Sequence, residues 1–277
     1  MYDMLCMIDS PCGSEESVKK FIKTKINVPF HEDAIGNLIA HKEGNGQKLM
    51  LYVSIDEDAF LAMNVKGKEI SATHLGDKKV NKGDLVSFSG FMGVIDSPED
   101  NLVKLLKEYD VNQGDCSAIN IPSYEDDGIL FSKEAASKLV ISAMCEAIDK
   151  DNDVDVYFVF GVKSKMGGKG LIAATKSIKP DKLIIFEDTK KQSDKLTIKL
   201  MAKGFSSTRG FFEQLCDKND LCCEVDSKEK TIASLVSCEN IAVIGVPVEF
   251  KDNIRQAVKL DLKDEILNLI IRSMKND

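Results

Sequence analysis

Acidic side chains follow three apolar stretches of this 277-residue chain, each at the point where a strand would end. They are Asp56-Glu57-Asp58 after Leu49–Val53, Glu187-Asp188 after Leu183–Phe186, and Asp252 after Ile241–Val248. The carboxyl ends of strands meet at one edge of an α/β sheet, where active sites are built. Carboxylates gathered there could bind a hard cation or act as general acid and base. The alternative interpretation is that they are solvated turn residues.

A glycine-rich stretch and the cysteines resemble a phosphate-binding loop and a metal or thiol site, but neither has the spacing that those sites require. Gly167-Gly168-Lys169-Gly170 lacks the first glycine and the final hydroxyl residue of a phosphate-binding loop, so it predicts a strand-to-helix turn with positive φ. The eight cysteines form no Cys-x-x-Cys pair, and no histidine lies at metal-site spacing from them. Reduced thiols packed in a core are the expectation. A thiol enzyme using Cys222 or Cys238 has no support beyond the cysteine count.

Composition narrows the class of protein. The chain is 43% hydrophobic and 30% charged, as is ordinary for a globular protein. A net charge of -8 and a pI near 5.1 argue against broad nucleic-acid binding. No apolar run approaches the roughly 18 residues of a membrane span, and the first residues lack the pattern of a signal peptide. We therefore expect a cytoplasmic protein that binds neither nucleic acid nor membrane.

The order of elements predicts an α/β domain with an insertion. Gly13–Ser17 begins a helix, and buried strands follow at Leu38–Ala40 and Leu49–Val53. Between residues 63 and 124 the apolar pieces become short and are separated by glycines, which is typical of a small β barrel or sandwich. Within it, Ser97-Pro98-Glu99 resembles a helix start. The α/β pattern resumes after Gly128. The predicted domains are residues 1–62 with 125–277, and residues 63–124.

Several segments, taken in order, resemble one enzyme family. Gly36-Asn37-Leu38-Ile39, Ser54-Ile55-Asp56-Glu57, the stretch from Val154 to Gly170 and Lys179-Pro180-Asp181 are similar to the glutamyl and deblocking aminopeptidases, some of which are called endoglucanases. These cytoplasmic enzymes use two divalent cations, zinc or cobalt, and build tetrahedral dodecamers. The resemblance implies a three-layer α/β/α catalytic-type domain with an inserted β-barrel-like dimerisation domain.

The departures from that family fall on its chemistry. Matched to its motifs, the first histidine ligand corresponds to Ser54, the bridging aspartate to Ser132, the general base to Ser164, the adjacent glutamate ligand to Lys165 and the last histidine to Asp252. Glu187 alone keeps the charge type of a ligand. Asp56 also persists, although the histidine that it orients in the family is absent. A lysine at a metal position adds positive charge where cations need negative charge.

These substitutions predict a catalytically inactive or strongly impaired homologue of a metallo-aminopeptidase, with no bound metal and no catalytic residue. The chain would keep its fold and assemble with itself or with a related active peptidase, and it could bind peptides in the remnant cleft. The alternative is an active hydrolase with a rebuilt mono-metal site. Its ligands would come from the residual acidic cluster, defined as Asp56, Glu57, Glu187, Asp188 and Asp252.

Overall fold

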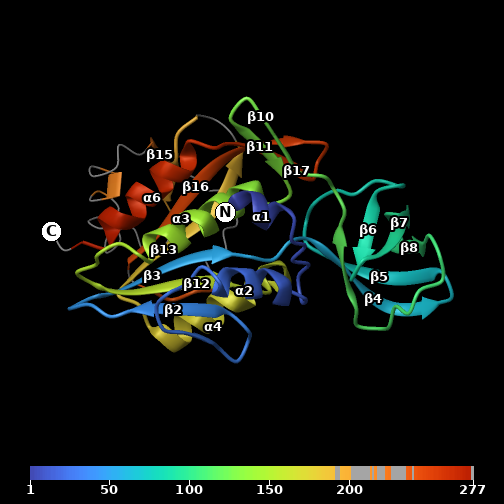
Figure 1. Ribbon diagram of the computed structural model, residues 1–277, viewed down its shortest axis with the longest axis horizontal. Coiled ribbons are helices and arrows are strands. Elements are labelled where there is room, and N and C mark those ends of the chain that lie inside the picture. Colours follow the sequence, from blue (N-terminus) through green and yellow to red (C-terminus); the bar gives the residue numbers. More distant parts are fainter. Residues whose placement is uncertain are drawn as a thin grey trace.

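The computed structural model describes residues 1–190, 194–200, 213, 215–216, 222–225, 235–238 and 240–275. Most of the helix expected between Ser207 and Cys216 lies outside these residues. Within them, no helix is long and apolar enough to cross a bilayer. Figure 1 shows an α/β domain with a β barrel projecting from one side of it.

The larger domain is built on a mixed sheet with strand order β1-β2-β12-β3-β13-β16-β17-β11-β10, and β14 joins β15 to β16. Its strands are β1 (Phe30–Glu32), β2 (Leu38–Lys42), β3 (Lys48–Ser54), β10 (Tyr124–Asp126), β11 (Ile129–Ser132), β12 (Asp155–Gly161), β13 (Lys182–Lys190), β14 (Thr197–Leu200), β15 (Cys222–Val225), β16 (Asn240–Lys251) and β17 (Arg255–Lys259). Its helices are α1 (Tyr2–Cys6), α2 (Glu16–Lys23), α3 (Ala135–Ala147), α4 (Lys169–Ile178), α6 (Leu262–Ser273) and the 3-10 turn η1 (Ser164–Met166).

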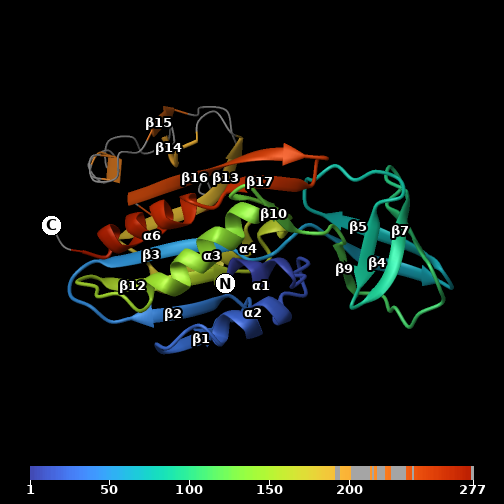
Figure 2. The same cartoon turned by 45° about the horizontal axis from the view of Figure 1, so that its top comes forward.

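Both faces of the sheet are covered. Alternate residues of β3 point to opposite sides, so Leu51 packs under α3 and α6 while Met50 packs against α4. Figure 2 shows α3 and α6 lying side by side across one face. Strands β12, β3, β13 and β16 run parallel, which places their carboxyl ends at one edge. The predicted three-layer α/β/α architecture is confirmed.

The inserted unit is a closed barrel with strand order β4-β5-β8-β7-β6-β9. It comprises β4 (Ala59–Lys66), β5 (Glu69–Leu75), β6 (Leu85–Phe88), β7 (Phe91–Ser97), β8 (Leu102–Leu105) and β9 (Cys116–Ile119). The barrel therefore begins at Ala59, four residues before the boundary expected from sequence. The helix predicted from Ser97 was wrong, because Asn101 has φ +52° and returns the chain as a hairpin into β8.

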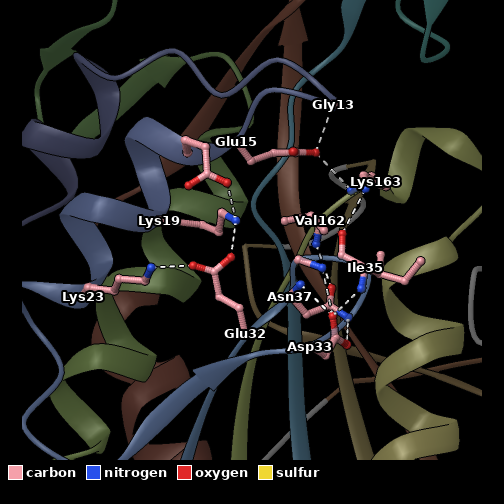
Figure 3. A network of polar contacts seen from close by, with 12 residues as sticks. Gly13, Glu15, Lys19, Lys23, Glu32, Asp33, Ile35, Asn37, Val162 and Lys163 are labelled. Carbon is pink, nitrogen blue, oxygen red and sulfur yellow. Dashed lines mark hydrogen bonds and ion pairs between the residues drawn. The ribbon is translucent and has the colours of Figure 1, made fainter.

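A buried asparagine joins the elements that lead into the site edge. The side-chain amide of Asn37 donates to Asp33 Oδ2 at 2.7 Å and to the Gly170 carbonyl at 2.8 Å, and its oxygen accepts from the Val162 amide at 3.0 Å. Figure 3 shows Asn37 between Asp33 and Val162. Asn37 thereby ties the start of β2 to the turn after β12 and to α4. In that turn Gly167 and Gly168 have φ +81° and +68°, so the predicted strand-to-helix turn is present.

Candidate functional site

The acidic triplet Asp56-Glu57-Asp58 lies at the carboxyl edge of the sheet, where the chain leaves β3 and enters the barrel. All three residues are buried, with exposed fractions of 2%, 2% and 3%. Isolated carboxylates at such depth would cost several kcal/mol each, so they require compensating charge or hydrogen bonds. The interpretation as solvated turn residues does not hold for these three.

Glu57 is bound by two lysines. Its Oε2 lies 3.0 Å from Lys133 Nζ and its Oε1 lies 3.0 Å from Lys138 Nζ. Burial raises the pKa of Glu57, but the two ammonium groups outweigh burial and hold the pKa at about 2. Lys133 also contacts Asp9 Oδ1 at 2.8 Å, and its own pKa is raised, because Glu57 and Asp9 outweigh burial. Glu57 is therefore a carboxylate with both oxygens occupied by internal cations.

A third lysine lies between two further carboxylates. Lys165 Nζ is 3.2 Å from Asp58 Oδ1 and 3.3 Å from Glu134 Oε1. Burial opposes the charge on Lys165, but Glu134 and Asp58 outweigh it and raise the lysine pKa. The other oxygen of Asp58 accepts from the Lys78 amide at 2.8 Å and lies 3.4 Å from His74 Nε2. Burial raises the pKa of Asp58, and these partners lower it to about 2.

Three more of the predicted positions at this edge, Ser132, Ser164 and Lys165, form hydrogen bonds to charged side chains. Ser164 Oγ donates to Asp56 Oδ1 at 2.6 Å, and the Lys165 amide donates to Asp56 Oδ2 at 3.0 Å. Ser132 Oγ, which is buried, accepts from Lys138 Nζ at 3.1 Å and pairs with Ser123 Oγ at 2.7 Å. The structure thus joins Ser164 and Lys165 to Asp56, whereas Ser132 is joined through Lys138 to Glu57.

Three other predicted residues lie on neighbouring strands of the same edge. Ser54 pairs in register with Gly161, and Glu187 lies one residue beyond Phe186, the register partner of Val53. Asp188 accepts from Gln256 Nε2 at 3.1 Å and adds to the negative field at Lys165. The site edge therefore includes the carboxyl ends of β3, β12 and β13.

Asp252 has a different environment. It lies in the tight turn between β16 and β17, with φ +47°, and half of its side chain is exposed. Its carboxylate accepts from the Arg255 amide at 3.1 Å and pairs with Arg255 Nη1 at 3.3 Å. Both contacts stabilise the turn itself. The solvated-turn interpretation describes Asp252 well.

The donor set at the edge does not fit two adjacent divalent cations. Such cations lie about 3.5–4 Å apart and need bridging and terminal anions to offset their repulsion. Ser54 and Ser132 offer neutral hydroxyls, while Lys165 places a fixed positive charge among the carboxylates. At an effective dielectric of 20, one unit charge at about 4 Å opposes another by roughly 4 kcal/mol. An ammonium group can neutralise carboxylates, but it offers no vacant coordination position to a substrate or a water.

Lys133, Glu134 and Lys138 belong to this network but were not predicted from the sequence. Lys138 lies on α3 among residues that the helix buries, and a lone lysine in a buried helical row was the available signal. Lys133 and Glu134 immediately follow Ser132, and both are buried. Glu57, the partner of Lys133, is more than 70 residues earlier in the chain, and Glu134 pairs with Lys78 and Lys165, which are also distant in the sequence, so no local pattern predicts these pairings.

Comparisons of the sequence and of the fold with known proteins both identify similarity to peptidases. No protein-family model matches the chain. A protein of Acetivibrio thermocellus named "Putative aminopeptidase" is 28% identical over 203 residues, which are 64% of this chain and 62% of that protein. The match thus spans less than two thirds of that relative.

Solved structures match over almost the full chain. The TET1 peptidase of Pyrococcus horikoshii, which can assemble into a tetrahedron or a large octahedral shell, superposes with a TM-score of 0.85 at 15% identity, covering 99% of this chain and 98% of that one. An endoglucanase of Thermotoga maritima has a TM-score of 0.81 at 19% identity, covering 99% and 96%. The predicted resemblance to aminopeptidases is confirmed, and at these identities the structural matches establish the fold.

Proposed function

We propose that this chain, similar to an aminopeptidase in sequence and to peptidases in fold, is a non-catalytic homologue in which internal ion pairs replace a di-metal centre. One observation carries the proposal. Lys165 Nζ lies between Asp58 and Glu134 at the position where the resemblance puts a metal ligand. A lysine there supplies the positive charge that the carboxylates need and leaves no place for a second cation of higher charge.

The occupied carboxylates also count against a rebuilt mono-metal site. Both oxygens of Glu57 face lysine ammonium groups, and Asp252 serves its own turn. A cation bound at Glu57 would have to displace two ion pairs that are already desolvated. Asp56, Glu187 and Asp188 would then remain as ligands, with Ser164 in place of a general base. Loss of a general base alone typically removes a factor of about 10²–10⁴ in rate.

The role proposed for the protein is assembly in the cytoplasm, with itself or with a related active peptidase. The TET1 match, a peptidase that forms closed shells, supports self-assembly. The described free thiols suit a reducing compartment. Co-assembly predicts that a related peptidase is recovered with the tagged chain from its native host. Its repeated absence would leave self-assembly as the remaining form of this proposal.

Hydrolysis assays test the loss of activity. The full chain, loaded with zinc, cobalt or manganese, is expected to hydrolyse aminoacyl-p-nitroanilides and short peptides no faster than the buffer blank. Glu187→Ala is the matched variant, because Glu187 alone keeps the charge type of a family ligand. Cation-dependent hydrolysis that disappears in Glu187→Ala would overturn the proposal in favour of a rebuilt site.

A further inference from the structure

A second group of potential ligands lies beside the lysine-filled edge and takes no part in its ion pairs. Cys12 lies in the turn before α2, Glu15 is the residue that precedes the first turn of α2, and Asp56 follows β3. One ligand atom from each residue lies within 4.8 Å of the other two. Their exposed fractions are 0%, 5% and 2%, so the three groups share one buried space.

Both carboxylates are held in place by hydrogen bonds from the backbone and a hydroxyl. Glu15 Oε1 accepts from the amides of Gly13 at 2.9 Å and Lys163 at 3.2 Å, as Figure 3 shows. Asp56 accepts from Ser164 Oγ and from the Lys165 amide. Hydrogen bonds of this kind orient carboxylate ligands in metal sites. These hydrogen bonds limit the movement of both carboxylates before any cation arrives.

The thiol is aimed at the same carboxylates. The side chain of Cys12 hydrogen-bonds to Asp56, and burial followed by the charges of Asp56 and Glu15 raises its pKa. Burial and Asp56 likewise raise the pKa of Glu15. The lysines of the neighbouring network form their ion pairs with Asp9, Glu57, Asp58 and Glu134, while Asp56 only adds to the negative field at Lys165. A cation placed among the three groups would offset their mutual repulsion and favour the thiolate.

We infer that Cys12, Glu15 and Asp56 bind one zinc-type divalent cation. Tetrahedral zinc, with one sulfur and two oxygens at their usual distances, sets its ligand atoms about 3.5 Å apart. The ligand atoms lie at most 4.8 Å apart, so closure around zinc requires side-chain shifts of no more than about 1 Å. A thiolate ligand disfavours calcium and magnesium, which take six or more oxygens. This site shares Asp56 with the residual acidic cluster, but its other two ligands, Cys12 and Glu15, come from the turn before α2 and not from that cluster.

A second sulfur lies close to the same turn. Cys116 opens β9 of the barrel, and a Cβ built on Gly13 would lie 3.2 Å from its Sγ. Burial raises the pKa of Cys116, and Glu15 raises it further, so this thiol shares the same negative surroundings. The proposed cation site therefore lies beside the barrel, with the Cys116 thiol as a neighbour of the turn that carries Cys12.

Cobalt is the probe that separates this site from the acidic edge, because a cobalt–thiolate bond gives a charge-transfer absorption in the near ultraviolet. The reduced full chain is loaded with Co²⁺, desalted and measured for bound metal and absorption. We expect about one cobalt per chain with the thiolate band, and displacement of that band by zinc. Cys12→Ser should abolish the band and weaken cobalt binding at least tenfold.

Two further variants complete the design. Cys6→Ser removes a thiol of α1 outside the cluster and should leave both band and stoichiometry unchanged. Glu15→Gln, which keeps the side-chain shape, should weaken binding even if Cys12→Ser fails to fold. Retention of no cobalt by the wild-type chain would overturn this inference and leave the proposed function intact. Cobalt retained without a thiolate band would overturn both, because the ion would then occupy the acidic edge.

Discussion

At the scale of single residues, Glu57 and Asp58 are buried carboxylates whose charge is neutralised by lysines of the same chain. Each carboxylate lies at the carboxyl edge of a parallel sheet and is paired with an ammonium group about 3 Å away. An ammonium group balances charge in the way a cation does, yet it is attached to the chain and cannot polarise a carbonyl or acidify a water as a metal does. Carboxylates in this arrangement can therefore stabilise the fold without a bound metal.

The ion pairs predict a specific loss of stability in acid. The pKa of Glu57 is about 2 in the folded protein against an ordinary value of 4.5, so its ionisation favours folding above that ordinary value. The contribution, on the order of 3 kcal/mol of unfolding free energy, should disappear as pH falls from about 5 to about 2. Asp58 acts in the same direction. Urea unfolding at several pH values measures the slope.

Glu57→Gln is the informative variant for this slope. It should be less stable at pH 7, because two buried lysines lose their partner, and its stability should depend less on pH between 5 and 2. Glu108→Gln alters an exposed glutamate of the barrel and should retain the wild-type slope. A Glu57→Gln slope equal to that of the wild type would show that these ion pairs do not set the acid stability.

At the scale of elements, the close approach of α4 to β12 makes a prediction about Gly170. A Cβ on Gly170 would lie 2.2 Å from the Val162 carbonyl oxygen and 2.6 Å from Asn37 Oδ1, both of which are fixed. Gly170→Ala should therefore lose roughly 3 kcal/mol of unfolding free energy. Gly46→Ala is the comparison, because Gly46 has φ +89° but no atom within 4 Å of an added Cβ. This variant should lose about 1 kcal/mol of unfolding free energy. Equal losses, measured by chemical denaturation, would contradict this account of the contact.

Sequence patterns predicted secondary structure well in segments with a clear hydrophobic pattern, and poorly in segments whose structure depends on the conformation of a turn. The strand at Leu49–Val53 could be predicted from its continuous apolar side chains, and the turn before α4 from its glycines, because both depend on local sequence. The sequence after Ser97 is compatible with a helix start and with a hairpin. The hairpin forms because Asn101 adopts a left-handed backbone conformation, which the sequence pattern does not specify. Likewise, the pairing of Glu57 with Lys133 depends on folding that joins distant segments, which a single sequence does not reveal.

At the scale of the whole molecule, the barrel is one of the parts that expose large apolar side chains, and others lie on the larger domain. The barrel carries four exposed large apolar side chains, which are Met63, Leu85, Phe91 and Leu106. Figure 1 shows the barrel projecting away from the helices of the larger domain. Exposed apolar side chains favour association when a partner covers them, because each one that becomes fully buried contributes about 1.5–3 kcal/mol.

Charge placed on this surface should therefore lower the molecular mass in solution. Leu106→Glu and Met63→Glu, with exposed fractions of 52% and 46% in the single chain, should shift the protein from an oligomer toward the 30.6 kDa monomer. Light scattering after size exclusion measures the shift. Met7→Glu is the matched control, because Met7 is 80% exposed but lies outside the barrel. If Met7→Glu dissociates the assembly while the two barrel variants do not, the interface belongs to the α/β domain. A wild-type chain that is already monomeric would contradict self-assembly directly.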